Sequence, residues 1–448
     1  MIEPATEQVL AEVPEAGLEE ADQAVARAKA AFPAWRAVAP RDRANLMRRL
    51  ATAVEREADK LATLEARNVG KPISDARGEV GMVVDVFNYF AGAPERLFGK
   101  TIPVAGGVDM TFREPLGVVA LIVPWNFPIA ITSWKVGPAL AAGNTIVLKP
   151  AGLTPLTAIE LERIALEAGI PEGVFNVVVG AGRVVGERLV QHADVAKVAF
   201  TGSTEVGKRI GQLAAASIKR VTLELGGKSA NIVFADADIE KAAASAPLAV
   251  FGNAGQDCCA RSRILVERSA VERFMRALET SIKALRVGDP LDENTEMGPL
   301  ISADQRDKVA SYLEDGARVA IRGHAPSGPG YWFPPTVLSP VANTDRVARE
   351  EIFGPIVAVI PFDDEADAIR IANDTVYGLS GSIWTGNAGR ALRVARALEV
   401  GNLSINSNNS VRVTTPFGGF KQSGIGRELG PHALEHYTEL KNVFLSTT

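Results

Sequence analysis

The sequence predicts an α/β protein built from two parallel-sheet domains and a small additional β element. With 448 residues, the chain is too long for a single compact core. From residue 117 onward, short β-rich runs alternate with helical stretches, the rhythm of a parallel sheet covered by helices. A second alternation follows residue 258. We therefore expect a doubly wound domain first and a second α/β domain after it.

Helices are predicted before the first strand. An Ala-rich stretch over residues 19–32 is typical of a helix. Over about residues 43–66, leucine and valine recur three, four or seven positions apart, which is the spacing of one face of an amphipathic helix.

The elements of the two alternations can be placed by residue number. Strands of the first domain are expected at 118–123, 145–148, 175–179, 195–200 and 221–225, with helices such as 155–168 and 182–192 between them. In the second domain, strands are expected near 263–266 and 356–361, and a helix over 365–373.

The composition excludes several classes of protein. Apolar residues make up 47% and charged residues 23%, the balance of a soluble globular protein. A net charge of −5, dispersed along helical segments, provides no basic stripe for a nucleic-acid partner. No apolar run approaches the roughly 18–20 residues that a membrane span needs, and the first residues do not resemble a signal peptide.

The two cysteines, Cys258 and Cys259, are adjacent. Neighbouring Cα atoms lie about 3.8 Å apart, below the usual disulfide range of roughly 4.4–6.8 Å. We therefore expect free thiols and a cytoplasmic protein. The four histidines form no cluster with cysteine or carboxylates at metal-binding spacing, so no metal site is expected.

Two glycine-rich turns follow predicted strands. Residues 202–209 open a helix whose N-terminal N–H groups can face a phosphate. Their spacing nearly fits a Walker A loop, but Arg209 replaces the required hydroxyl residue. Gly180-Ala181-Gly182, with Gly186 one helical turn later, forms the second turn. Each turn is either a phosphate site or only a tight connection.

Cys258 and Glu224 are candidates for chemistry, and each has a plainer interpretation. Cys258 could be a small buried apolar residue, although the polar neighbours Gln256 and Asp257 are awkward in a plain core. Glu224 ends a strand-like run at a glycine pair. An acid in that position either forms a structural ion pair or transfers protons at a site.

Three further segments combine rigid turns with polar side chains. Asn126, between Pro124 and Pro128, is either a buried turn residue or a donor to an oxyanion. Lys149 follows a strand, where it either meets a ligand or reaches out to solvent. Residues 350–355 join two acids, an aromatic residue and a turn; the alternative there is a solvated acidic turn.

Together these segments resemble motifs of the aldehyde dehydrogenase superfamily. The chain carries, in the family's order, Pro-Trp-Asn-Phe-Pro at 124–128, Lys-Pro at 149–150, Phe-Thr-Gly-Ser-Thr-x-x-Gly at 200–207, Glu-Leu-Gly-Gly-Lys at 224–228, Gly-Gln-x-Cys at 255–258, Glu-Ile-Phe-Gly-Pro at 351–355 and Pro-Phe-Gly-Gly-Phe-Lys-x-Ser-Gly at 416–424. The resemblance extends over nearly the whole chain.

The resemblance implies a Rossmann-like cofactor domain, an α/β catalytic domain and a small β oligomerisation element. We expect the cofactor domain at 1–96 and 116–226 and the catalytic domain at 227–431. The oligomerisation element would combine 97–115 with 432–448. Separated strands at one edge can extend a partner's sheet, so we expect a homodimer or homotetramer.

The resemblance also implies a reaction. The thiolate of Cys258 would attack the aldehyde to form a thiohemiacetal, with the Asn126 amide and the Cys258 N–H as oxyanion hole. Hydride transfer would leave a thioester, which water activated by Glu224 would hydrolyse. The rival within the family is a CoA-acylating enzyme, and the presence of Glu224 favours hydrolysis. A P-loop nucleotidase, a Cys-His hydrolase and a catalytically silent binding protein fit the motifs less well.

NAD is the implied cofactor, with NADP as the alternative. Lys149 would contact the adenosine ribose, and Gly182 and Gly186 would allow close packing near the adenine. The remaining cofactor residues are expected to be Trp125, Gly202, Ser203, Leu225, Glu351 and Phe353, with Ser203 at the pyrophosphate and Glu351 at the nicotinamide ribose. Many NAD-preferring members carry Glu where this chain has Gly152. In those members the carboxylate binds the adenosine ribose and repels the 2′-phosphate of NADP, so its absence removes one reason for this chain to reject NADP.

The substrate is a small-molecule aldehyde, for which the resemblance implies a pocket of Phe127, Trp134, the neighbours of Cys258 and the segment 408–417. Asp257 beside the nucleophile resembles some aminoaldehyde-oxidising members. The alternative is that Asp257 only forms a local hydrogen bond. Arg412, if it pointed inward, would disfavour a cationic substrate.

Overall fold

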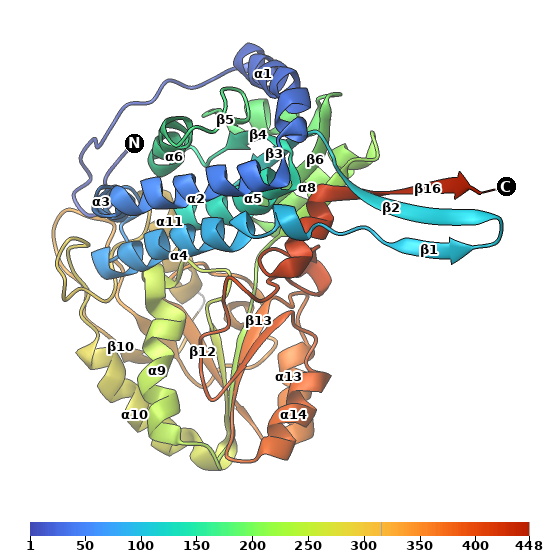
Figure 1. The fold of residues 1–448 in the computed structure, drawn as a ribbon. Helices are drawn as coiled ribbons and strands as arrows, with labels where there is room; N and C mark the ends of the chain where they lie inside the picture. Colours follow the sequence, from blue (N-terminus) through green and yellow to red (C-terminus); the bar gives the residue numbers. More distant parts are fainter. Residues whose placement is uncertain (315, 448) are drawn as a thin grey trace.

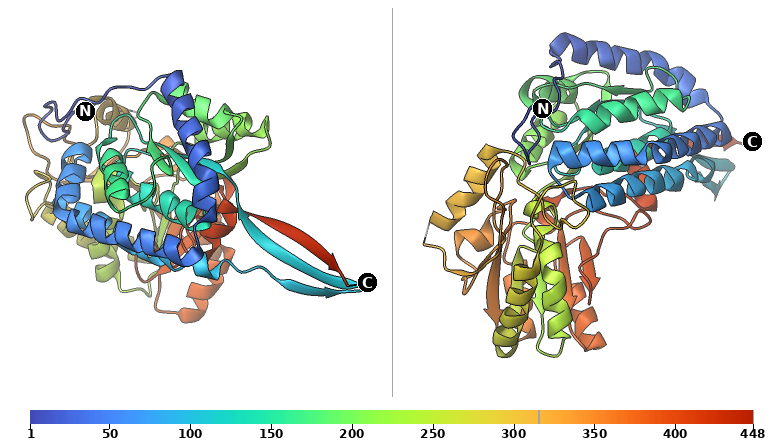
Figure 2. Two further views of the ribbon diagram at one scale, coloured as in Figure 1. Left: turned by 45° about the horizontal axis from the view of Figure 1, so that its top comes forward. Right: turned by 90° about the vertical axis from the view of Figure 1, so that its left-hand side faces the viewer.

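Two lobes and a projecting arm make up the molecule (Figure 1). The computed structural model describes residues 1–314 and 316–447. One lobe contains a six-stranded sheet and the other a seven-stranded sheet, while three strands form the arm. Figure 2 shows that the arm extends well away from both lobes. No helix of the described residues is long and apolar enough to span a membrane.

The six-stranded sheet has the strand order β15-β7-β6-β3-β4-β5. Its strands are β3 (Val118–Ile122), β4 (Thr145–Lys149), β5 (Phe175–Val177), β6 (Val195–Thr201), β7 (Arg220–Glu224) and β15 (Gly424–Ile425). The first five strands are mutually parallel, and β15 pairs antiparallel with β7. The strands predicted from the β-α alternation are confirmed to within two residues at each end.

Helices cover both faces of this sheet. They are α1 (Leu18–Ala37), α2 (Pro40–Arg56), α3 (Ala58–Val69), α4 (Ile73–Ala91), α5 (Pro128–Ala142), α6 (Leu156–Glu167), α7 (Glu187–Gln191) and α8 (Thr204–Ala215). Alternate residues of β3 belong to different cores: Val119 and Leu121 pack with α2 to α6, whereas Val118 and Ala120 pack with α1, α7 and α8. Successive side chains of β3 thus point to opposite faces of the sheet, and each face is buried under helices.

The predicted helix over 43–66 is wrong as a single element, because the chain breaks at Glu57. Helix α2 ends at Arg56 and α3 begins at Ala58. Glu57 has φ −103° and ψ 15°, outside the helical range. Both helices pack against α4. The apolar spacing continues across the break, so it could not show that the backbone leaves the helical conformation there.

The seven-stranded sheet has the order β10-β11-β12-β9-β8-β13-β14. Its strands are β8 (Ala230–Val233), β9 (Arg263–Glu267), β10 (Val319–Arg322), β11 (Thr336–Leu338), β12 (Ile356–Phe362), β13 (Ser380–Trp384) and β14 (Asn402–Ile405). Only β10 pairs antiparallel. The accompanying helices are α9 (Ile239–Phe251), α10 (Val271–Ala284), α11 (Ala303–Glu314), α12 (Arg346–Arg349), α13 (Glu365–Asn373) and α14 (Ala388–Ala397). The second α/β domain is thereby confirmed, with β9, β12 and α13 where they were predicted.

The arm consists of β1 (Thr101–Val104), β2 (Gly107–Pro115) and β16 (Thr438–Ser446). Strand β16 pairs antiparallel with β2 along its whole length, from Thr438 opposite Pro115 to Ser446 opposite Gly107. Its role in oligomerisation and the domain boundaries stay predictions. The predicted ranges 227–431 and 432–448 each include one residue, 315 and 448, outside the described residues.

Candidate active site

Two cavities meet at Cys258. The larger has a volume of about 960 Å³ and lies along the carboxyl ends of β3, β4 and β6, the sheet edge at which α/β proteins bind ligands. The smaller has a volume of about 210 Å³ and is lined by side chains of both lobes. Four residues line both cavities: Ile131, Thr201, Leu225 and Cys258. A group bound in either cavity can therefore approach the Cys258 side chain.

The loop before Cys258 has an unusual backbone. After α9, three successive residues have positive φ: Asn253 (49°), Ala254 (55°) and Gly255 (71°). A Cβ atom on Gly255 would lie 2.3 Å from the carbonyl oxygen of Gly354, so only glycine allows the two loops to touch. Left-handed non-glycine residues cost free energy and occur where function needs a fixed geometry. This loop therefore holds the nucleophile in place.

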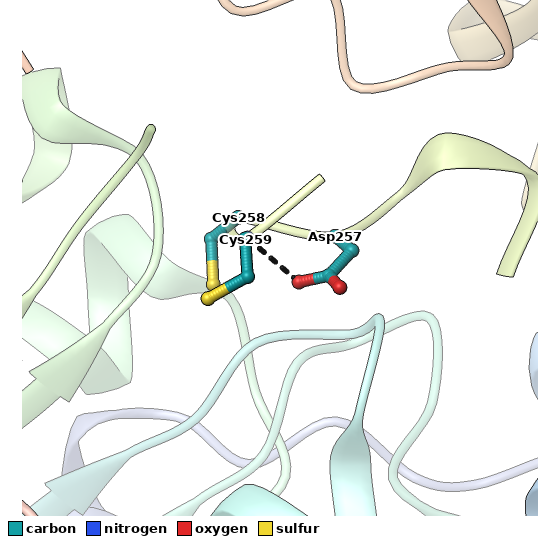
Figure 3. Close-up of side chains that lie close together, drawn as sticks. All are labelled: Asp257, Cys258 and Cys259. Carbon is teal, nitrogen blue, oxygen red and sulfur yellow. Dashed lines mark hydrogen bonds between the residues drawn. The ribbon is translucent and has the colours of Figure 1, made fainter. Parts of the chain in front are cut away.

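Cys258 and its two neighbours turn their side chains toward one another (Figure 3). The backbone N–H of Cys259 donates to Asp257 Oδ1 at 2.7 Å, so the local hydrogen bond considered for Asp257 is present. The hydrogen bond between the two thiols and burial both raise the pKa of Cys258 well above its usual value. The resting nucleophile is consequently a thiol, which needs a base before it can attack.

Glu224 is a buried acid without a partner. It ends β7, lines the smaller cavity and is 3% exposed. Neither carboxylate oxygen has a hydrogen-bond partner among the described residues. Burial, followed by the nearby Glu428 carboxylate, raises the pKa of Glu224 well above its usual value. A structural ion pair, the plainer interpretation from sequence, does not form; an unpaired carboxyl facing a cavity is suited to proton transfer.

A second acid lies beside Glu224 and is paired. Glu428 forms a buried ion pair with Lys135 of α5, and its other oxygen, Oε2, has no hydrogen-bond partner among the described residues. Glu428 also lines the smaller cavity. Two carboxyls near each other resist being ionised together, so Glu428 influences the proton affinity of Glu224.

Asn126 is anchored to the nucleophile loop. Its Nδ2 donates to the carbonyl oxygen of Gln256 at 2.9 Å, and Asn253 Nδ2 donates to the Asn126 carbonyl oxygen at 2.9 Å. Gln256 is itself fixed, because its Oε1 accepts from the Ile301 N–H at 2.9 Å. Asn126 is therefore a buried turn residue, as one interpretation held. An amide nitrogen carries two N–H groups, and the second is available for a ligand.

Lys71, between α3 and α4, supports the Asn126 turn from behind. Its Nζ donates to the Asn126 carbonyl oxygen at 2.9 Å and to Glu79 at 2.6 Å. The same nitrogen lies 4.5 Å from the centre of the Phe127 ring. Burial raises the pKa of Glu79, although Lys71 partly opposes that shift. A buried lysine with these partners keeps the turn rigid.

The walls of the smaller cavity are mainly aromatic and aliphatic. Phe127, Trp134, Val411 and Phe417 line it, as the resemblance implied. Trp134 and Phe417 make an edge contact, with ring centres 5.1 Å apart, a favourable arrangement for aromatic pairs. Arg412 does not line this cavity but a separate surface hollow beside Met82. It therefore places no positive charge at the cavity wall.

Lys149 lies in the wall of the larger cavity. The residue is 5% exposed, and its Nζ donates to the Pro150 carbonyl oxygen at 2.9 Å. Burial lowers its pKa. The alternative of a lysine that reaches into solvent is therefore wrong. A Cβ atom on Gly186 would lie 3.5 Å from Lys149 Cδ, so the turn of Gly182–Gly186 packs directly on this lysine.

The turn at 202–209 begins helix α8. Ser203 is its N-cap, and its side-chain oxygen accepts from the Val206 N–H at 3.3 Å. A Cβ atom on Gly202 would lie 2.4 Å from the Phe200 ring, so glycine is needed for this close approach. Gly202, Ser203, Glu205 and Val206, at the start of α8, line the larger cavity. A helix N-terminus in this place favours an anionic group such as a phosphate.

Glu351 and Phe353 close the larger cavity from the other lobe. Glu351 Oε1 accepts from the Gly227 N–H at 2.9 Å, and burial raises its pKa to about 7. Phe353 has φ 58° and makes an edge contact with Trp125, with ring centres 5.2 Å apart. This segment is a structured wall of the cavity, so the alternative of a solvated acidic turn is wrong.

The structure gathers the predicted site residues around these two cavities. Those assigned to the cofactor all line the larger one: Trp125, Lys149, Gly182, Gly186, Gly202, Ser203, Leu225, Glu351 and Phe353. Asn126 lines the larger cavity, Glu224 the smaller, and Cys258 both. The individual role of each residue stays a prediction.

Comparison with known proteins identifies the family. The family model described as "Aldehyde dehydrogenase family" matches residues 1–443. The chain belongs to this family. It is 45% identical to an aldehyde dehydrogenase of Emericella nidulans, over 99% of this chain and 90% of that enzyme. It is also 45% identical to betaine aldehyde dehydrogenase 1 of Rhizobium meliloti, over 99% of this chain and 93% of that enzyme.

A solved structure shows that the fold is also that of the family. The NAD⁺ complex of an aldehyde dehydrogenase from Bacillus cereus superposes with a TM-score of 0.98 at 44% identity. The match covers 100% of this chain and 93% of that one. The aldehyde dehydrogenase-like fold expected from the motifs is confirmed.

Several residues of this family member's site were missed by sequence reasoning. Lys71, Lys135 and Glu428 stand outside the motifs that carried the resemblance. Lys135 lies inside the wholly buried helix α5, and a charged residue within such an apolar run was the one available signal of a functional pair. No local pattern indicated Lys71, because its role depends on contacts with Asn126 and Glu79.

Proposed function

We propose that the protein oxidises an aldehyde to a carboxylic acid with NAD⁺, through a thioester on Cys258. The observation that carries this proposal is the position of Cys258 where the two cavities meet, with the unpaired Glu224 carboxyl lining the smaller one. This arrangement puts a nucleophile and a base on the aldehyde side, and leaves the larger cavity for a dinucleotide. Both thiols are free, which fits work in the reducing cytoplasm.

The first step is the attack of sulfur on the aldehyde carbon. Glu224 takes the thiol proton of Cys258, the new C–S bond forms, and the carbonyl electron pair moves to oxygen. The second N–H of the Asn126 amide would stabilise that oxyanion. The backbone N–H of Cys258 would be the other donor, since it has no acceptor within the described residues. The product of this step is a thiohemiacetal.

NAD⁺ bound in the larger cavity supplies the acceptor for the hydride that leaves the thiohemiacetal carbon. The cavity fits such a group, because its wall combines the α8 N-terminus, Lys149 and the Glu351 carboxylate. Gly182 and Gly152 leave open space, with nothing within 4 Å of an added Cβ atom. The NAD⁺ complex of the Bacillus cereus relative supports this assignment.

Glu224 completes the reaction by activating water. The proton that Glu224 took from the thiol first passes to solvent, which restores the carboxylate. A water molecule that loses a proton to this carboxylate then attacks the thioester carbonyl, and the Cys258 sulfur leaves as the acid forms and recovers a proton from Glu224. The raised pKa of Glu224 makes it a stronger base than an exposed glutamate once it is deprotonated. A CoA-acylating enzyme is the alternative, in which CoA rather than water takes the acyl group; the unpaired carboxyl favours water.

The test is reduced-nicotinamide absorbance with the product acid quantified, for the wild type and Cys258→Ala. We expect one acid formed for each cofactor reduced, and no turnover in the variant. Retained turnover in Cys258→Ala would overturn the mechanism. Turnover that required CoA and yielded an acyl-CoA would favour the alternative.

The smaller cavity supports an aminoaldehyde as substrate. Its wall combines aromatic rings with four acids, which are Glu79, Asp257, Glu224 and Glu428. Aromatic faces and carboxylates both attract a cationic amine. The betaine aldehyde dehydrogenase of Rhizobium meliloti is a close relative. We expect Asp257→Asn to raise KM for an aminoaldehyde severalfold more than for a neutral aldehyde of equal length; equal changes would count against this substrate class.

We propose that the arm joins subunits into a homodimer or homotetramer. Its exposed side chains include Ile102, Phe112, Leu440 and Phe444, an apolar surface that a monomer would leave in water. Sedimentation of the wild type and of Leu440→Glu tests this. A monomeric wild type would refute the proposal, whereas dissociation of the variant alone would support it.

A further inference from the structure

Asp257, Cys258 and Cys259 bring three ligand groups together. One carboxylate oxygen and the two sulfur atoms all lie within 4.8 Å of one another. Figure 3 shows both sulfurs on the same side of the backbone, close to each other. Adjacent residues of an extended strand would point to opposite faces, so it is the turn at this point in the chain that makes the two thiols neighbours.

This spacing suits a single thiophilic cation. Zn²⁺ binds cysteine sulfur at about 2.3 Å and carboxylate oxygen at about 2.0–2.2 Å, so two sulfurs in a tetrahedral site stand roughly 3.8 Å apart. Ligand atoms within 4.8 Å of one another can approach these distances through small side-chain rotations. Three protein ligands leave a fourth position open, as in zinc sites that are accessible to small molecules.

The charges around the cluster favour a cation. Glu224 lines the same cavity with both oxygens unpaired and only 3% exposed, so it is a buried acceptor without a partner. The cationic side chains that face this region are already engaged. Lys71 pairs with Glu79, and Lys135 pairs with Glu428.

Arg261 is the remaining cation beside the cluster. It is buried, and its guanidinium donates to the carbonyl oxygens of Cys259 and Asn408 and to Ser410 Oγ. These hydrogen bonds direct it to the backbone rather than to the two sulfurs.

We propose that Asp257, Cys258 and Cys259 form an inhibitory site for a thiophilic divalent cation, such as Zn²⁺. On binding, each thiol releases a proton to solvent and two S–Zn bonds form, with the Asp257 carboxylate as third ligand. The sulfur of Cys258 is then no longer available to attack an aldehyde. Removal of the cation by a chelator restores the free thiols.

This site was not predicted, because none of the four histidines lies at metal-binding spacing from the cysteines or carboxylates. Cys-Cys pairs at adjacent positions do not have the usual spacing of zinc ligands. The inhibition part of the inference rests on the proposed function of Cys258, whereas metal binding itself does not.

Binding can be measured without turnover. Cd²⁺ titrated into the metal-free enzyme reports thiolate coordination through ultraviolet charge-transfer absorption. We expect one Cd²⁺ per chain in the wild type and binding at least about tenfold weaker in Cys259→Ser and in Cys258→Ser, since even supporting residues of metal sites contribute roughly 10–100-fold. Asp257→Asn should weaken binding by a smaller factor.

His432→Ala is the matched control. His432 is exposed beside Glu435, far along the chain from the cluster, and it represents adventitious surface binding. The inference is overturned if the absorption is absent in the wild type, if it persists in Cys259→Ser, or if His432→Ala removes it.

Inhibition provides the second test. Zn²⁺ should stop aldehyde oxidation reversibly, with a chelator restoring the rate, and Cys259→Ser should raise the half-inhibitory concentration at least about tenfold relative to its own uninhibited rate. Equal sensitivity of the two enzymes would mean that Cys258 alone binds the metal, and would refute the two-thiol site. If the enzyme had no aldehyde activity at all, the Cd²⁺ titration would still decide whether the metal binds at this site.

Discussion

The two cavities that meet at Cys258 are built in different ways. The larger one is formed by turns at the carboxyl ends of parallel strands, where glycines let the backbone approach a ligand. The smaller one is formed by side chains from α4, α5 and distant loops. Backbone geometry suits a constant ligand such as a cofactor, whereas side chains can vary with the substrate without disturbing the sheet.

The cavities also differ in charge. The larger one is lined by four basic side chains, Lys149, Arg183, Arg209 and Lys308, and by three acids, Glu187, Glu205 and Glu351. The smaller one has four acids and three aromatic rings. The first is suited to an anionic dinucleotide and the second to a neutral or cationic aldehyde. Each substitution below should therefore affect one cavity and leave the other nearly unchanged.

The largest effect is expected from Glu224→Gln. Glu224 lines only the smaller cavity, so loss of the base should lower kcat by about 10²–10⁴-fold while the Kd for NAD⁺ stays close to that of the wild type. Steady-state kinetics and cofactor fluorescence measure the two quantities. Glu224→Asp, which keeps a shortened carboxylate, should retain more activity than the amide. A large change in Kd would mean that the two cavities are not independent.

The pH dependence should separate the cavities next. The pKa of Glu224 is raised, and its carboxylate must be free to take the proton of the Cys258 thiol and later that of water. Activity is therefore low at acidic pH and should rise by about tenfold per pH unit while Glu224 is still protonated. The Kd for NAD⁺ should weaken only below about pH 7, where Glu351, with its pKa near that value, becomes protonated. A kcat/KM independent of pH would contradict this assignment.

Gly152→Glu should sharpen the selectivity of the larger cavity. No atom lies within 4 Å of a Cβ added at Gly152, so the side chain can be accommodated. A carboxylate there would repel a 2′-phosphate and hydrogen-bond the ribose of NAD⁺. We expect KM for NADP⁺ to rise at least about tenfold, with a smaller change for NAD⁺. Gly152→Gln has nearly the same size without the charge, and an equal effect of both variants would point to steric blockage instead.

The smallest effects are expected from two matched aromatic variants. Each cavity has one edge-to-face pair: Trp125–Phe353 in the larger and Trp134–Phe417 in the smaller. Such a pair contributes about 0.5–1.5 kcal/mol, or roughly two- to tenfold. Phe353→Ala should raise KM for NAD⁺ by this factor, and Phe417→Ala should raise KM for the aldehyde. Kinetics with each substrate varied in turn measure both constants. If the cavities were not separate, Phe353→Ala would also raise KM for the aldehyde, or Phe417→Ala would also raise KM for NAD⁺.

Sequence reasoning placed the elements of the first sheet well, because buried parallel strands are short apolar runs between turns. Thus β3 and β6 were predicted to within one residue. The helix break at Glu57 was missed, since Val54 and Leu61 keep the same apolar face on both sides of it. Strands β8 and β13 were not predicted either, although both are fully buried.

The sequence by itself determined the family, the alternation of strands and helices along the chain, and the identity of Cys258, Glu224 and Asn126 as candidates. These follow from motifs and spacing that are local in the chain. Only the tertiary structure decided that Gly255 touches Gly354, and that Asn126 bonds to Gln256 130 positions away. The same holds for the Lys135–Glu428 pair, 293 positions apart, and for the convergence of the two thiols. Long-range packing fixes such contacts, and no local pattern of residues encodes them.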